Sequence, residues 1–128
     1  MGLLVLDTSV LVGDWPPERP AAVSMVSVGE LHAGVELATT PAERARREQR
    51  LERVLETYVA MPVDLDVARA YGAVLSLSRR TDGPRNRADL LIAATAVAHA
   101  AGLATRDRRL AAFARRLGLD VAEPPAPV

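Results

Sequence analysis

The sequence predicts an α/β protein, an α/β/α sandwich around a central, mostly parallel sheet. Short apolar runs alternate with longer helical segments along the 128 residues, as expected when helices connect parallel strands. The first run, residues 3–6, is continuously apolar, which is typical of a strand buried on both faces. Because no internal repeat or linker interrupts the chain, we expect one domain over residues 1–128, with a frayed tail from about residue 123.

In the first half of the chain, prolines predict a loop over residues 14–20, and residues 22–26 are the second expected strand. Ser27 is expected to cap a helix that runs to about Leu37. Pro41 opens the next helix, a favoured position for proline. One apolar face of this helix is formed by Leu51, Val54, Leu55 and Tyr58.

In the second half, residues 61–63 are a short extended piece, and Asp66 is expected to cap a helix with Val67, Ala70, Tyr71 and Val74 on its apolar face. Asn86 is expected to cap an apolar helix that runs through Ala101 and ends at Gly102. The remaining expected elements are a strand over 103–105, a helix ended by Gly118 and a strand over 119–122.

The composition excludes several kinds of chemistry. The chain has no cysteine, which removes zinc–thiolate sites, iron–sulfur clusters and thiol catalysis. All 16 basic residues are arginine, so a Walker-type phosphate loop and a Schiff-base lysine are also excluded. The four aromatic residues are too few for a platform that stacks many bases.

The distribution of apolar residues indicates neither a leader nor a membrane anchor. Residues 3–6 are too short for the apolar part of a signal peptide, and Asp7 interrupts them. The longest apolar stretch, residues 90–104, falls short of the ~20 residues that span a bilayer. We therefore expect a cytoplasmic protein without membrane contact.

Four carboxylates lie where strands end or helices begin. Asp7 ends the first strand, Glu30 and Asp89 lie in first turns of predicted helices, and Asp107 follows the strand over 103–105. In an open parallel sheet, the ends of strands and the starts of the helices that follow them share one edge, where ligands bind. This rule brings Asp7, Glu30 and Asp107 together, and Asp89 joins them if its helix starts at the same edge. Crowded carboxylates repel one another unless some are protonated or a cation neutralises them. An all-oxygen site without histidine or cysteine favours Mg²⁺, which Mn²⁺ could replace.

Each of these carboxylates also has a structural explanation. Ser27 and Glu30 match a capping box, Asp89 suits a helix dipole, and Asp107 could cap the last long helix. Their joint occurrence at four matching places favours a functional site over four coincidences.

The residues around these carboxylates form motifs. They are residues 6–11 (LDTSVL), 27–34 (SVGELHAG), 88–96 (ADLLIAATA) and 105–107 (TRD). In this order and combination the chain resembles the PIN-domain ribonucleases, above all the VapC toxins of type II toxin–antitoxin pairs, over essentially its whole length. The resemblance implies a PIN fold, usually in a homodimer, with magnesium-dependent endoribonuclease activity that leaves 5′-phosphate and 3′-hydroxyl ends. It also implies inhibition by a cognate VapB antitoxin.

Carried over by motif, the resemblance implies that Asp7, Glu30, Asp89 and Asp107 form the catalytic metal site. Asp7 and Asp89 would contact the metal directly, and Glu30 and Asp107 would position water or a second metal. Hydroxyls that would orient this shell are those of Thr8, Ser9 and Thr105. The region between Glu30 and Asp89 is short for the family, and this difference affects the substrate-facing loops.

Arginines beside the acidic residues are candidates for binding RNA phosphates, because an acidic site alone repels RNA. These candidates are Arg85, Arg87, Arg106, Arg108 and Arg109. By contrast, Arg44, Arg46, Arg47 and Arg50 are expected on a solvated helix face. Trp15, beside two prolines, either anchors a loop or meets a partner.

Two other protein families fit this sequence poorly. Haloacid-dehalogenase phosphatases also begin with an aspartate after the first strand, but they need a second aspartate where this chain has Ser9, and a later lysine. Receiver domains likewise need a lysine. Two alternatives stay open: a catalytically silent PIN domain that only binds RNA or a partner, and a nuclease of the same fold that cleaves DNA.

Overall fold

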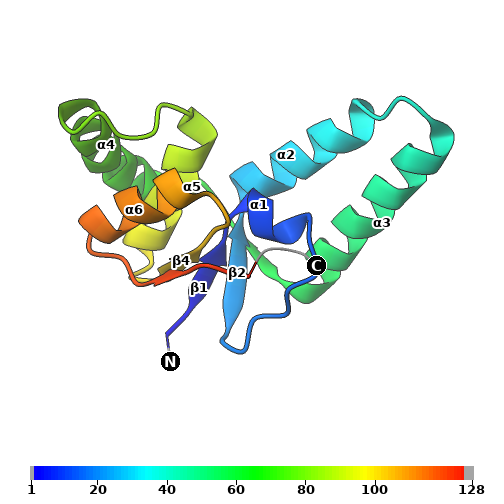
Figure 1. Cartoon of the computed structure of the whole chain (residues 1–128), viewed down its shortest axis with the longest axis horizontal. Coiled ribbons are helices and arrows are strands. Elements are labelled where there is room, and N and C mark those ends of the chain that lie inside the picture. Colours follow the sequence, from blue (N-terminus) through cyan, green and yellow to red (C-terminus); the bar gives the residue numbers. More distant parts are fainter. Residues whose placement is uncertain (1, 126–128) are drawn as a thin grey trace.

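A five-stranded sheet in the order β3-β2-β1-β4-β5 forms the centre of the computed structural model, which describes residues 2–125 (Figure 1). All neighbouring strands are parallel. The strands are β1 (Leu4–Leu6), β2 (Ala21–Ser24), β3 (Val59–Met61), β4 (Gly102–Ala104) and β5 (Val121–Ala122). With helices on both faces, this sheet confirms the predicted fold class.

The strand order explains where a site can form. The chain leaves β1 for β2 and β3 on one side, then returns to the other side of β1 as β4 and β5. Such a reversal opens a crevice at the carboxyl ends of the two strands that flank it, here β1 and β4. Leu6 pairs with Ala104, so the residues that follow them, Asp7 and Thr105, leave the sheet side by side.

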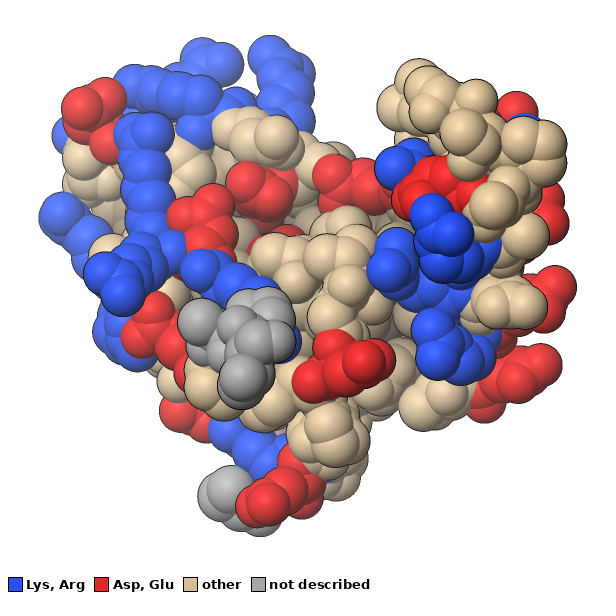
Figure 2. All heavy atoms as spheres, turned by 45° about the vertical axis from the view of Figure 1, so that its right-hand side comes forward, with Lys and Arg blue, Asp and Glu red and all other residues tan. Residues whose placement is uncertain are grey.

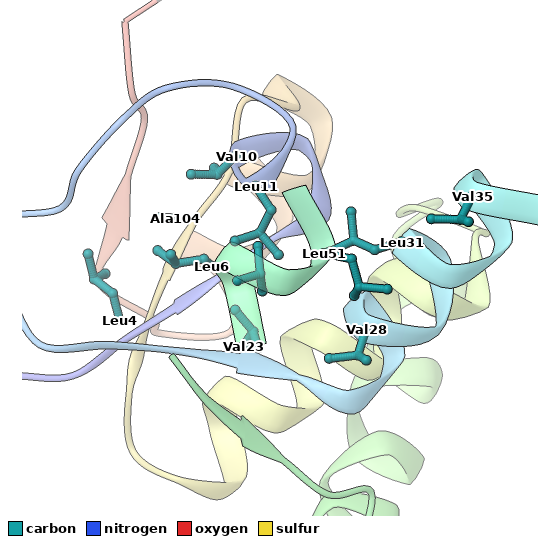
Figure 3. Packing of buried hydrophobic residues seen from close by; sticks show 11 residues of the cluster. Leu4, Leu6, Val10, Leu11, Val23, Val28, Leu31, Val35, Leu51 and Ala104 are labelled. Atoms are coloured by element: carbon teal, nitrogen blue, oxygen red, sulfur yellow. The ribbon is translucent and has the colours of Figure 1, made fainter. Parts of the chain in front are cut away.

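One face of the sheet is covered by α1 (Thr8–Leu11), α2 (Met25–Glu36) and α3 (Pro41–Thr57). Figure 3 shows Val10 and Leu11 of α1 directed toward Leu6 and Ala104 of the sheet, with Leu31 and Leu51 joining α2 to α3. Beyond this contact the α2–α3 hairpin projects away from the sheet (Figure 1). This hairpin therefore forms one wall beside the carboxyl edge.

The other face is covered by α5 (Arg87–Ala98) and α6 (Arg108–Arg116), while α4 (Leu65–Arg80) packs outside α5. The buried residues Ile92 and Ala96 of α5 and Leu110 of α6 lie against Val5 and Leu103 of the sheet. Alanines along α5 allow its neighbours to approach closely. The predicted apolar face of α4 is confirmed, because Val67 and Val74 are buried against α5.

The start of α2 differs from the prediction. Its N-cap is Ser24, whose side chain accepts a hydrogen bond from the Val26 N–H at 3.1 Å, whereas Ser27 is buried within the helix. The strand pairing ends at Ser24, so the helix begins at once and Met25 is helical rather than extended. Consequently Glu30 lies in the second turn, and the capping-box explanation for it is wrong.

Two further boundaries differ, and one short helix was not predicted. The N-cap of α4 is Asp64, which accepts from the Val67 N–H at 3.0 Å, and Asp66 lies in the first turn, where the helix dipole favours a carboxylate. The extended piece expected at 61–63 is β3, two residues earlier. The helix α1 was not predicted, because four residues are too short to show a periodicity.

The end of α5 also differs. The helix ends at Ala98 instead of Ala101, and Ala100 turns the chain with a φ of 50°. Gly102 is not a helix stop but the first residue of β4, where a Cβ atom would lie 2.9 Å from the Asp120 carbonyl oxygen. By contrast, Gly118 ends α6 as predicted, with a left-handed φ of 84°.

The start of the predicted frayed tail is held by contacts. Glu123 forms an ion pair with Arg115 at 2.9 Å, and the Pro125 carbonyl accepts a hydrogen bond from Arg106. The rest of that predicted tail, residues 126–128, lies outside the described residues. No helix within residues 2–125 has the length and apolar character to cross a membrane.

Candidate active site

Asp7 is a buried carboxylate at the carboxyl end of the central strand. It occupies the N-cap position of α1, but its side chain makes no capping hydrogen bond. Instead its Oδ2 atom accepts hydrogen bonds from Ser9 Oγ at 2.7 Å and from Thr105 Oγ1 at 2.8 Å. Because both predicted hydroxyls bind the same oxygen, they fix the orientation of the carboxylate.

The two hydroxyls are themselves held by the backbone. Ser9 Oγ accepts from the Arg106 N–H at 3.0 Å, and Thr105 Oγ1 accepts from the Asp107 N–H at 3.1 Å. Each hydroxyl can therefore direct its single proton to Asp7. This network joins the ends of β1 and β4 across the crevice.

Asp107 has a structural role as well as its place at the site. It is the N-cap of α6, and its Oδ1 accepts from the N–H groups of Arg109 at 2.9 Å and Leu110 at 3.2 Å. The alternative explanation for this residue, a helix cap, is confirmed. No described group binds its other oxygen, Oδ2, so the cap and a ligand role can coexist.

Glu30 is exposed on α2 and faces α1. Thr8 Oγ1 donates a hydrogen bond to Glu30 Oε1 at 2.5 Å and lies 3.0 Å from the hydroxyl of Ser27. The threonine thereby connects the carboxylate to a buried serine of the same helix. Glu30 is held at the crevice by this contact, in place of the capping role expected from the sequence.

Asp89 lies in the first turn of α5, below the predicted cap Asn86, whose side chain accepts from the Asp89 N–H at 3.2 Å. Burial and, after it, the negative charges of Asp7, Asp107 and Glu30 together raise the pKa of Asp89 from 3.8 to about 6. The helix runs antiparallel to β4, which brings its N-terminus to the carboxyl edge. All four predicted carboxylates therefore share one electrostatic neighbourhood.

The donor atoms of this neighbourhood fit a hard divalent cation, because they are carboxylate and hydroxyl oxygens. Within residues 2–125, no three carboxylate or imidazole groups converge closely enough to hold an ion between them. One or two direct carboxylate ligands with water in the remaining positions is the arrangement that Mg²⁺ prefers. The residues present therefore fit a largely hydrated ion and do not form a closed cage.

The predicted arginine contacts divide into two groups. Figure 2 shows acidic side chains gathered in the middle of this face of the molecule, with basic side chains on both sides of them. Arg87 and Arg108 are exposed and form no ion pair with any described residue. The other three candidates are engaged: Arg85 lies 3.6 Å from the Asp82 carboxylate, Arg109 donates to the carbonyls of Asp82 and Gly83, and Arg106 donates to Pro125.

Arg50 of α3 was not predicted at the site. It borders a hollow of about 200 Å³ together with Thr8 and Glu30. The sequence placed it on a solvated face, because nothing in its spacing shows that the second half of α3 lies near α1. Its neighbour Arg47 is held by Glu43 at 2.8 Å and by the Gly34 carbonyl at 2.6 Å.

Comparisons with known proteins agree with this architecture. A family model described as PIN domain matches residues 4–116. The chain is 34% identical to VapC ribonuclease Y4jK of Sinorhizobium fredii, over 95% of this chain and 97% of that protein. It is 37% identical to ribonuclease VapC5 of Mycobacterium tuberculosis, over 85% of this chain and 86% of that protein. Among solved structures, VapBC-5 of Mycobacterium tuberculosis, described as a member of the VapBC family of toxin–antitoxin systems, superposes with a TM-score of 0.86 at 30% identity, over 97% of this chain and 100% of that chain.

Proposed function

This chain belongs to the PIN domain family, and on that premise we propose that it is a VapC-type toxin, a magnesium-dependent endoribonuclease. The names of its relatives support the ribonuclease activity. The observation that supports the proposal most is that Asp7, Glu30 and Asp107 lie close enough to Asp89, near the crevice between β1 and β4, for their charges to add to the effect of burial on its pKa, which rises to about 6.

In this proposal Asp7 and Asp89 hold the divalent ion directly. Ser9 and Thr105 keep one Asp7 oxygen occupied, which leaves Oδ1 for the ligand. Glu30, held by Thr8, and the second oxygen of Asp107 accept hydrogen bonds from water in the crevice and orient it toward the phosphate. When bound, the ion supplies positive charge that activates water and stabilises negative charge on the phosphate.

Arg87 and Arg108 offset the repulsion between this acidic crevice and the RNA backbone. Both are exposed beside Asp89 and Asp107, and a guanidinium binds a phosphate through two parallel hydrogen bonds. We expect each to contribute to RNA affinity in a salt-dependent way, because binding a phosphate releases counterions.

We also propose that a VapB-type antitoxin inhibits the protein and that two copies form a homodimer. The antitoxin is supported by the likeness to VapBC-5 of Mycobacterium tuberculosis. Co-purification with the product of an adjacent antitoxin gene tests the first partner, and light scattering of the separated protein tests the dimer.

The decisive experiment is cleavage of total bacterial RNA by the purified protein, freed of any antitoxin, beside single- and double-stranded DNA. Each reaction is run with Mg²⁺, with Mn²⁺ and with chelator, using wild type, Asp7→Asn and the matched control Asp66→Asn on the exposed surface of α4. We expect discrete, metal-dependent cuts in RNA that only Asp7→Asn abolishes. Cleavage of DNA alone would indicate the DNA-directed nuclease, and a folded protein that binds RNA or a partner without cutting would indicate the silent PIN domain.

A further inference from the structure

A second hollow lies next to the acidic crevice, between α1, the loop at residues 13–16 and α3. Its volume is about 240 Å³. The side chains that matter here are Val10, Trp15, Val54, Tyr58, Arg50 and Arg53. It combines an apolar floor with two aromatic rings and two guanidinium groups. Since pockets for drug-sized ligands span roughly 300–1,000 Å³, this one suits a smaller planar group.

This hollow is connected to the acidic crevice through Arg50. That arginine borders both the hollow with Trp15 and the one that contains Thr8 and Glu30. The helix α1 separates the two, with Thr8 toward the crevice and Val10 toward the aromatic rings. A ligand that reaches the carboxylates from this side therefore passes Arg50.

The charges along α3 distinguish its two halves. In the first half, Arg44, Arg46 and Arg47 each form ion pairs with glutamates. In the second half, Arg50 and Arg53 form no ion pair within residues 2–125, although both border the hollow. Among the described residues, Asp14 is the only carboxylate that lines the same hollow, so this wall carries more arginines than carboxylates.

We propose that this hollow is a nucleobase subsite for the RNA strand, which rests on the proposed ribonuclease function. One base packs against Trp15 and Tyr58, and Arg50 and Arg53 bind the phosphates that lead from this base to the crevice at Glu30. The excess positive charge favours a polyanion over a polypeptide segment, because an unpaired guanidinium matches the geometry of a phosphate. Two aromatic rings are enough to stack one base, and the four aromatic residues of the sequence are too few to stack a longer run of bases.

The chain provides its own probe, because Trp15 is the single tryptophan in the sequence. Dye-labelled single-stranded RNA of mixed sequence is titrated into the protein with chelator present, so that binding is measured without cleavage. Polarisation of the dye reports binding anywhere, and tryptophan emission reports contact at the hollow. We expect both signals to saturate together.

Variants then locate the contact. Arg50→Ala and Arg53→Ala are each expected to weaken binding and to reduce the slope of log affinity against log salt by about one, as expected when one phosphate contact is lost. Tyr58→Ala is expected to weaken binding roughly tenfold through lost stacking. The matched control is Arg46→Ala, on the same helix but paired with Glu43, which should leave both signals unchanged. Circular dichroism verifies that each variant is folded.

The proposal is overturned if RNA binds without changing Trp15 emission and the Arg50 and Arg53 variants match the Arg46 control. Metal-dependent cleavage of the same RNA by wild type would then leave the ribonuclease function standing while the subsite falls. If a co-purified protein partner changes Trp15 emission and RNA does not, the hollow is a protein-docking site. If RNA is neither bound nor cut, both proposals fail.

Discussion

Replacing Asp89 by asparagine is expected to make the metal-free protein more stable near neutral pH while abolishing its activity. Asparagine keeps the size of the side chain and one oxygen but removes the negative charge. The pKa of Asp89 is raised from 3.8 to about 6, first by burial and then by the charges of Asp7, Asp107 and Glu30. The folded protein therefore bears a cost for keeping this group ionised.

The size and sign of the effect follow from that pKa. A rise from 3.8 to about 6 corresponds to about 3 kcal/mol at a pH above both values. The carboxylate is partly exposed, so we take roughly half, about 1.5 kcal/mol, to allow for solvent screening. Because the folded pKa lies above the unfolded one, Asp89 becomes protonated in the folded state as the pH falls through about 6. The free-energy cost of keeping Asp89 ionised decreases as the pH falls below about 6, and it is absent below about 3.8.

Urea unfolding in chelator, at about pH 7.5 and about pH 4.5, measures this difference. Asp89→Asn should exceed wild type by about 1.5 kcal/mol at the higher pH and by much less at the lower one. Asp66→Asn, in the exposed first turn of α4, controls for the loss of a favourable interaction with the helix dipole. An Asp89→Asn protein that is no more stable than this control at either pH would refute the reasoning.

Three other changes test the packing around the site. Thr105→Val removes a buried donor to Asp7 and leaves the Asp107 N–H without its acceptor. We therefore expect the free energy of unfolding, measured in urea, to fall by roughly 1–3 kcal/mol. A decrease below about 0.5 kcal/mol would contradict this hydrogen-bond network. Leu110→Ala empties space between α6 and the sheet and should cost about 2–5 kcal/mol, and an unchanged unfolding midpoint would show that this leucine is not in the core. Gly118→Ala forces a side chain into a φ of 84° and should lower the melting temperature at a cost of about 1 kcal/mol, whereas an equal or higher melting temperature would argue against the left-handed turn.

The sequence predicted the features that depend on local chemistry. The continuous apolar run at β1, the proline at the start of α3, the Asn86 cap and the glycine after α6 are all confirmed, because each is determined by its own neighbours. Asp7, Glu30 and Asp107 could also be assigned to one edge, since parallel strands place their carboxyl ends together. The place of Asp89 depends on where its helix begins, and the structure brings it near the other three.

Other features depend on tertiary contacts that spacing does not reveal. Ser24 and Ser27 are both suitable caps, and the end of the β2–β3 pairing decides between them. Arg109 lies next to Asp107 in sequence, yet its guanidinium binds the loop at residues 82–83, while Arg50, twenty positions from Glu30, borders the same hollow as that carboxylate. The direction of a long side chain cannot be predicted before the hairpin that carries it is placed.

The central position of β1 also governs when the proposed active site can first form during synthesis of the chain. β1 is made first, but its partner β4 and the Thr105 hydroxyl that orients Asp7 are made about a hundred residues later. A nascent chain on the ribosome therefore has Asp7 and Glu30 but no closed crevice until nearly the whole domain has emerged. The same long-range pairing predicts slow folding compared with helical proteins of equal length. For the ribonuclease proposed above, this order of assembly would protect the message and the ribosome that are producing it.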